Sequence, residues 1–145
     1  MSIVQEVGQA ARDIINEVIE LQASYNFPMR DVPRPYPALL VLYDGFSSAD
    51  DEDTNDAYVT DLKYALTLYL PFDGRNMEAR WDELTNLAWT IIVRFANDVT
   101  LGGTCRQCGL SAGEPVLHMS GAKPPKPVGM GHTFSLTARV ETEEE

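Results

Sequence analysis

Residues 58–70 read Tyr58-Val-Thr-Asp-Leu-Lys-Tyr-Ala-Leu-Thr-Leu-Tyr-Leu70, and this stretch decides the fold. From Leu62 onward every second residue is large and mainly apolar, whereas the residues between them are polar or small, except for Tyr69. Successive side chains of a strand point to opposite faces of a sheet, so this alternation predicts a long strand with one buried face. Such a strand needs partner strands and a layer that covers its apolar face.

A second strand and a helix are predicted upstream. Residues Ala38–Tyr43 form a continuous apolar run of strand length. The prolines before this run exclude a helix, so we expect an extended connector there. Ser2 and Gln5 have the spacing of a capping box, which predicts that a helix begins at the N-terminus and continues to about Ala23. Its apolar residues recur at helical intervals, at Ile3, Val7, Ala10, Ala11, Ile14, Val18 and Leu21.

A second helix is predicted downstream. Pro71 and Gly74 end the long strand, and either Asp73 or Asn76 is suited to cap a following helix. Six apolar residues of that helix fall within an arc of about 80° on a helical wheel. They are Met77, Trp81, Leu84, Ala88, Ile91 and Phe95.

Trp89 and Val93 lie outside that arc and form a second apolar stripe. A helix packed on one face of a sheet would leave this stripe in water. Two interpretations remain open. Another loop covers the stripe, or the stripe is a subunit contact, where tryptophan is a favoured anchor.

The rest of the chain predicts further strands. Gly102-Gly103 forms a turn before two short strand candidates, Thr104–Cys108 and Pro115–Met119. The proline-rich segment 120–131 is predicted to be an irregular loop, and residues 133–140 alternate in the manner of a last strand. The complete order predicts a single α+β domain over residues 1–145. We expect two layers, with an antiparallel sheet of four to five strands and both helices packed on one face.

The charge of the chain is unevenly distributed. Of 22 acidic residues, six lie in the predicted acidic loop 44–57 and four in the acidic tail 141–145, and neither segment contains a basic residue. The net charge of −11 therefore comes mainly from these two segments. The rest of the chain carries 12 acidic and 11 basic residues, whose charges nearly cancel. Acidic segments repel phosphate backbones, which argues against a nucleic-acid binder of the usual kind.

The acidic loop lacks the order of a calcium-binding EF-hand, which requires alternate acids, a central glycine and a closing glutamate. One interpretation is a solvated, flexible loop. The other is electrostatic, namely that the loop repels a polyanion that passes close by. The acids concerned are Asp50, Asp51, Glu52, Asp53 and Asp56.

The N-terminus has no basic region followed by an apolar run, and no apolar run approaches the length of a membrane span. Cysteine usage is low, since Cys105 and Cys108 are the two cysteines of the chain. Both observations predict a protein that is made in the cytoplasm, has no membrane partner and experiences a reducing compartment.

Cys105, Cys108, His118 and His132 are of the types that bind zinc. Structural zinc sites usually show two close pairs of ligands, whereas the two histidines here are far apart in the sequence. Two buried or half-buried thiols are therefore the preferred interpretation, and no metal or other cofactor is predicted. The sequence contains none of the common hydrolase, metalloprotease, phosphate-loop or dinucleotide-binding motifs, so we do not expect an enzyme or any catalytic residue.

The turn after the second predicted helix reads Phe95-Ala-Asn-Asp-Val-Thr-Leu-Gly-Gly-Thr104. Together with the first helix, the entry Pro37–Tyr43, the long strand 59–70 and the last strand, it resembles the tail terminator family of long-tailed bacteriophages. These proteins are also called tail-completion or minor tail proteins of the lambda U type. The resemblance spans most of the chain.

The resemblance implies a non-enzymatic virion protein that is assembled in the host cytoplasm. It implies a hexameric ring at the head-proximal end of the tail tube, where the ring stops tube polymerisation and contacts the tail tube protein and a neck or head-completion protein. DNA would pass through without specific binding. In such a ring Trp89 and Val93 would form part of a subunit interface, and the acidic loop would face the lumen. The alternatives are a head-side neck or connector ring protein and a small zinc-binding cytosolic protein.

Overall fold

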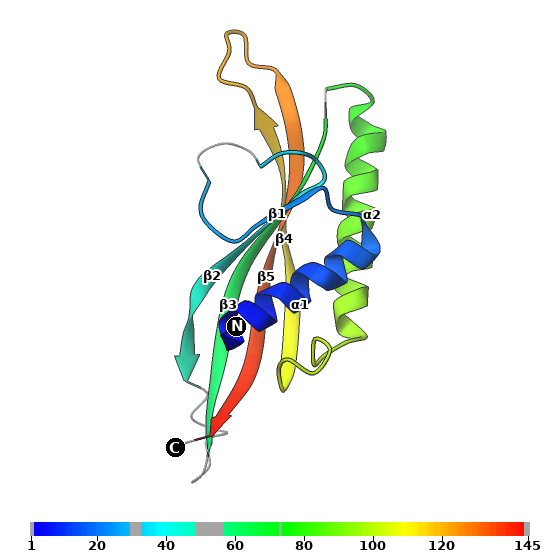
Figure 1. Ribbon diagram of the computed structural model, residues 1–145. Coiled ribbons are helices and arrows are strands. Elements are labelled where there is room, and N and C mark those ends of the chain that lie inside the picture. Colours follow the sequence, from blue (N-terminus) through cyan, green and yellow to red (C-terminus); the bar gives the residue numbers. More distant parts are fainter. Residues whose placement is uncertain (1, 30–32, 49–56, 73, 144–145) are drawn as a thin grey trace.

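The computed structural model describes residues 2–29, 33–48, 57–72 and 74–143. Two helices and five strands follow one another along the chain. In order, they are α1 (Ile3–Val18), β1 (Ala23–Tyr25), β2 (Ala38–Ser48), β3 (Ala57–Leu70), α2 (Met77–Ala96), β4 (Gln107–Met119) and β5 (Pro127–Glu143). The strands form one sheet in the order β1-β2-β3-β5-β4, and the two helices form a second layer on it (Figure 1).

The predicted α+β class is confirmed, and the stretch that predicted it lies at the centre of the sheet. β3 pairs antiparallel with β2 on one side and with β5 on the other, and β5 pairs antiparallel with β4. The sheet is nevertheless mixed, because the short strand β1 pairs parallel with residues Ala38–Leu40 of β2. The residues of β1 were expected to belong to the first helix and to the connector, so this strand was not predicted.

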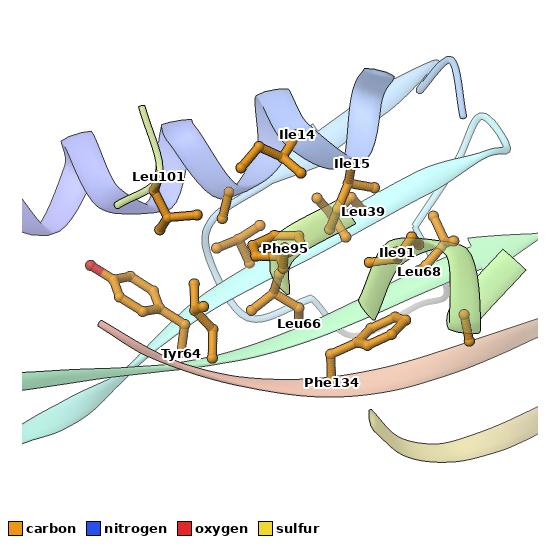
Figure 2. Packing of buried hydrophobic residues seen from close by; sticks show 14 of the residues in the cluster. Ile14, Ile15, Leu39, Tyr64, Leu66, Leu68, Ile91, Phe95, Leu101 and Phe134 are labelled. Carbon is orange, nitrogen blue, oxygen red and sulfur yellow. The ribbon is translucent and has the colours of Figure 1, made fainter. Parts of the chain in front are cut away.

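The main core lies between the helices and one face of the sheet. From Leu62 onward the even-numbered side chains of β3 contribute to it, with Leu66 and Leu68 fully buried. Figure 2 shows Phe95 of α2 among side chains of α1 and of β3. Tyr64 is also buried, and its hydroxyl donates a hydrogen bond of 2.7 Å to the carbonyl oxygen of Val4. This bond fixes the N-terminal turn of α1 to the sheet.

A second, smaller apolar cluster explains why Tyr69 departs from the alternation of β3. Tyr69 points to the other face of the sheet, where it packs with Ala38 and Leu40 of β2. Side chains from β1 and from the proline-rich connector cover this cluster, among them Tyr25 and Tyr36. The connector therefore covers part of the second face of the sheet.

The first helix was predicted to reach about Ala23, and this prediction is wrong at its C-terminal end. The capping box of Ser2 and Gln5 is formed as predicted, but α1 ends at Val18. Ile19 then adopts an extended conformation, and the amide oxygen of Asn16 accepts a hydrogen bond from the backbone of Leu21. The apolar residues beyond the end of the helix pack against the core from an extended chain as well. Their helical spacing therefore predicted the end of α1 too far along the chain.

The second helix begins at Met77, as the predicted cap position Asn76 implies. Asn76 has a left-handed conformation with φ of 54°, and its side chain makes no capping hydrogen bond. The other predicted cap, Asp73, lies outside the described residues.

The C-terminal half differs from the prediction in its boundaries. The two short strand candidates belong to a single strand, β4, whose register shifts between Ala112 and Pro115, while residues 104–106 remain in turns. β5 begins at Pro127, so the proline-rich loop is limited to residues 120–126. β5 also extends into the acidic tail as far as Glu143.

β2 is longer than predicted and continues into the segment assigned to the acidic loop. Asp44 therefore lies in a strand rather than in a loop. The register of β2 against β3 shifts between Tyr43 and Phe46, where Gly45 has φ of 100°. A positive φ of this size favours glycine, which permits the local bulge.

An ion pair between Asp61 and Arg139 joins β3 to β5 across the sheet. Arg139 donates two hydrogen bonds, from Nε to Oδ1 at 2.9 Å and from Nη2 to Oδ2 at 3.2 Å. The hydrogen bonding from Arg139 lowers the pKa of Asp61. A lowered pKa means that the stabilisation is present above the ordinary carboxyl pKa of about 4 and is lost as the pH falls through the lowered value.

We therefore expect Asp61→Asn to lower the free energy of unfolding by about 1 kcal/mol at pH 7. The difference from the unsubstituted protein should shrink when urea unfolding is repeated at stepwise lower pH below 4. Asp13→Asn is the matched control, because Asp13 pairs with Arg12 at 3.0 Å but is 58% exposed. A difference for Asp61→Asn that stayed constant or grew on acidification would contradict the role given to this pair.

Candidate subunit interface

The α2 stripe, defined as Trp89 and Val93, lies on the solvent side of the second helix. The opposite side of α2 is buried in the core through Leu84, Ala88, Ile91 and Phe95. Trp89 is 69% exposed and Val93 is 41% exposed, so no described segment covers either side chain. An indole with most of its surface in water is a candidate anchor for a subunit contact, where tryptophan is favoured.

The α2 stripe also faces away from the other helix. On its α1 flank, α2 is tied to α1 by an ion pair between Arg94 Nη2 and Glu17 Oε2 at 2.6 Å. Trp89 lies five positions before Arg94, which corresponds to about 140° around the helix. Asp82 lies seven positions before Trp89 and is therefore almost in line with it, about 20° away. The exposed flank of α2 thus combines an apolar centre with an acidic end.

A cleft of about 620 Å³ opens on the other side of the helical layer, between α1 and the strands β1, β2 and β3. We call it the tyrosine cleft. Its walls include Val4, Gly8, Arg12, Tyr25, Tyr43 and Tyr64. Gly8 and Glu17 are nine positions apart, or about 180° around α1, so the cleft and α2 lie on opposite flanks of this helix.

The absence of a side chain at Gly8 keeps the cleft open. A Cβ atom at this position would lie 3.6 Å from Cε1 of Tyr64 and 3.8 Å from Cγ1 of Val41. Burial raises the pKa of Tyr64, whose hydroxyl donates a hydrogen bond to the carbonyl oxygen of Val4. Sequence reasoning missed this cleft, because its walls come from segments that are far apart in the chain. The glycine in an amphipathic helix was the one signal available.

The four candidate zinc ligands are not brought together. Cys105 lies between α2 and β4, and Cys108 lies at the start of β4. Their thiols approach the carbonyl oxygens of Val99 and Asp98 at 3.9 and 3.7 Å, respectively. His118 lies on the outer face of the sheet, with its ring 5.0 Å from that of Tyr69. In the part of the chain that the structure describes, no group of three or more His, Cys, Asp or Glu residues forms.

His132 belongs to the other face. Its ring lies 5.0 Å from that of Phe134 in the main core, and its Nδ1 is 2.9 Å from the carbonyl oxygen of Thr133. The sheet therefore separates the two histidines. Burial lowers the pKa of His118, whose Nε2 has no hydrogen-bond partner among the described residues, so this histidine is neutral at pH 7.

The thiol pair has a testable asymmetry. Cys105 is buried and Cys108 is half-buried. Hydrogen bonding between the two thiols lowers the pKa of Cys108 and, together with burial, raises that of Cys105. Because the thiolate is the reactive form, we expect iodoacetamide at pH 7 to alkylate Cys108 several-fold faster than Cys105. Timed alkylation followed by peptide mass spectrometry measures both rates, and Cys105→Ala, which removes the hydrogen-bond donor, should slow the reaction of Cys108. Equal rates at the two thiols would contradict this assignment.

The predicted lumen residues Asp50, Asp51, Glu52, Asp53 and Asp56 lie outside the described residues. The register of the sheet nevertheless relates the two acidic segments to each other. Ala57 at the start of β3 pairs with Glu143 near the end of β5, and β2 ends at the same end of the sheet (Figure 1). Ser48 at the end of β2, Ala57 at the start of β3 and Glu143 near the end of β5 therefore lie at the same end of the sheet, opposite the loop 120–126.

Neither of the two helices is both long enough and apolar enough to cross a membrane, as far as the described residues extend.

Comparisons with known proteins identify no family for this chain. No protein-family model matches the sequence, and no curated protein matches it. Among solved structures, the chain is similar to one in the "Virion of native gene transfer agent (GTA) particle". The identity is 15% and the TM-score is 0.35, with 94% of this chain and 92% of that chain covered. A likeness at this TM-score assigns no function.

Proposed function

We propose that this chain is a structural virion protein that forms a hexameric ring at the head-proximal end of a phage tail tube. The ring ends tube polymerisation and joins the tail to the neck while DNA passes through. The observation that carries the proposal is the α2 stripe, an exposed tryptophan and valine on a helix whose other side is buried. The resemblance of the sequence to tail terminators is the reason for proposing a hexameric ring on a tail tube.

Two further features support a ring through which DNA passes. A ring needs two different surfaces that meet head to tail, and the molecule has distinct candidate surfaces on opposite flanks of its helical layer. The excess negative charge of the sequence lies in residues 44–57 and 141–145, and such charge opposes specific binding of a polyanion. We assign the protein neither a catalytic residue nor a cofactor, and we place it in the virion after assembly in the host cytoplasm.

The experiment is a capping assay. Purified protein is mixed with purified tail tubes from the same virion and, separately, with portal complexes, and both mixtures are imaged by negative-stain electron microscopy. We expect a disc at one end of the tubes and no density on the portals. Density on the portals alone would replace the proposal with the second candidate, a head-side neck or connector ring. Binding to neither would refute a place at the head–tail junction.

A further inference from the structure

We infer that the α2 stripe of one copy docks into the tyrosine cleft of the next copy, with a second copy of this chain as the occupant of the cleft. The inference rests on the proposed function, because it names the two surfaces that would close the ring. It is carried by three observations on the described residues: where the two surfaces lie, what lines them, and how they are charged.

The positions of the two surfaces suit a head-to-tail contact. Gly8 in the cleft and Glu17 at the α2 contact lie about 180° apart on α1, and Trp89 lies about 140° from Arg94 on α2. The surfaces therefore face outward at opposite ends of the helical layer. Two different patches that face in opposite directions cannot form a two-fold dimer with each other, but they can generate a ring or a filament.

The lining of the cleft suits an indole ring. Tyr25, Tyr43 and Tyr64 contribute aromatic surface, and Val4 and Val41 contribute aliphatic surface. Aromatic pairs prefer edge-to-face or offset contacts, and a tyrosine wall allows such contacts without buried charge. The volume of about 620 Å³ lies in the range of about 300–1,000 Å³ that is typical of occupied pockets, so the cleft has room for Trp89.

The charges around the two surfaces are complementary. Arg12 is the charged residue in the wall of the cleft, and its partner within the chain is the neighbouring Asp13. That pair is solvent-exposed, so it contributes little and Arg12 can pair with another carboxylate. Asp82 is exposed on the line of the α2 stripe. A docked neighbour would bring the acidic end of its stripe toward the basic wall of the cleft, which selects one orientation of the two copies.

Charge reversal tests the pairing of the two surfaces. The oligomer of the purified protein is measured by native mass spectrometry and light scattering for Asp82→Arg, for Arg12→Asp and for the double variant. We expect each single reversal to weaken assembly at least tenfold and the double variant to recover most of the loss. Trp89→Glu should abolish the oligomer, whereas Thr90→Glu, at an exposed position on the adjacent side of α2, should leave it unchanged.

The outcomes separate this inference from the proposed function. Rings of unchanged stability in all variants would overturn the contact, and if those rings still capped tail tubes the proposed function would stand. If each single charge reversal weakened assembly and the double variant did not recover it, the pairing of these two surfaces would be overturned. An unsubstituted protein that neither forms rings nor caps tubes would overturn both. Circular dichroism of each variant shows whether it is folded, and all substituted positions are solvent-exposed or half-buried.

Discussion

Phe95→Ala is expected to lower the free energy of unfolding by about 3–5 kcal/mol, a large share of the about 5–15 kcal/mol that stabilises a typical domain. Phe95 is 2% exposed and lies where α1, α2 and the sheet meet (Figure 2). Its removal leaves a cavity that helices and strands held by their own hydrogen bonds cannot fill. Urea unfolding followed by circular dichroism measures the loss as a shift of the midpoint.

Phe46→Ala is the matched control, because it removes the same side chain from a position that is 70% exposed. Its effect should remain within about 0.5 kcal/mol. Equal losses for the two phenylalanine variants would mean that the cluster around Phe95 is not the main core.

Gly131→Ala is expected to cost about 1–3 kcal/mol, although it adds a single methyl group. A Cβ atom at this position in β5 would lie 2.8 Å from the carbonyl oxygen of Leu68 and 3.3 Å from Nε2 of His118. The carbonyl belongs to β3, the central strand, and cannot move without disturbing the register of three strands. The strain should therefore appear as a lower urea midpoint.

Gly109→Ala provides the control in the neighbouring strand β4. No atom lies within 4 Å of a Cβ placed at Gly109, so the same substitution meets open space. It should be neutral or stabilise by about 0.4–1 kcal/mol, because alanine restricts the unfolded chain. A destabilised Gly109→Ala together with an unaffected Gly131→Ala would contradict the packing described for the outer face of the sheet.

The long strand and the second helix could be predicted because each pattern has one dominant physical cause. Alternation in β3 follows from a sheet with one face against the core, and the exception at Tyr69 follows from the second cluster on the other face. The helical wheel of α2 separated the four residues that are buried from the exposed Trp89 and Val93. It was wrong for Met77, which it placed on the buried face and which is 44% exposed in the first turn of the helix. That these two residues contact another subunit stays a prediction.

Other features could not be predicted, because the sequence pattern there is weak or is compatible with two local structures. Leu21 fits a helical repeat as well as an extended chain, which concealed the end of α1 and the strand β1. β4 is an edge strand with mostly exposed residues, and Gly113 and Pro115 interrupt its pattern, so it was predicted as two fragments. The tyrosine cleft depends on which segments the fold brings together, and no local pattern encodes that.

The irregularities of the two outer strands restrict how copies of this protein can associate. β1 covers only Ala38–Leu40 of β2, and the remainder of β2 is interrupted where Gly45 bends the chain. β4, at the other edge, is interrupted between Ala112 and Pro115. Neither border offers a long straight row of backbone groups for strand-by-strand growth. Any contact between copies would therefore be made by side chains of matching shape rather than by the addition of one strand to another.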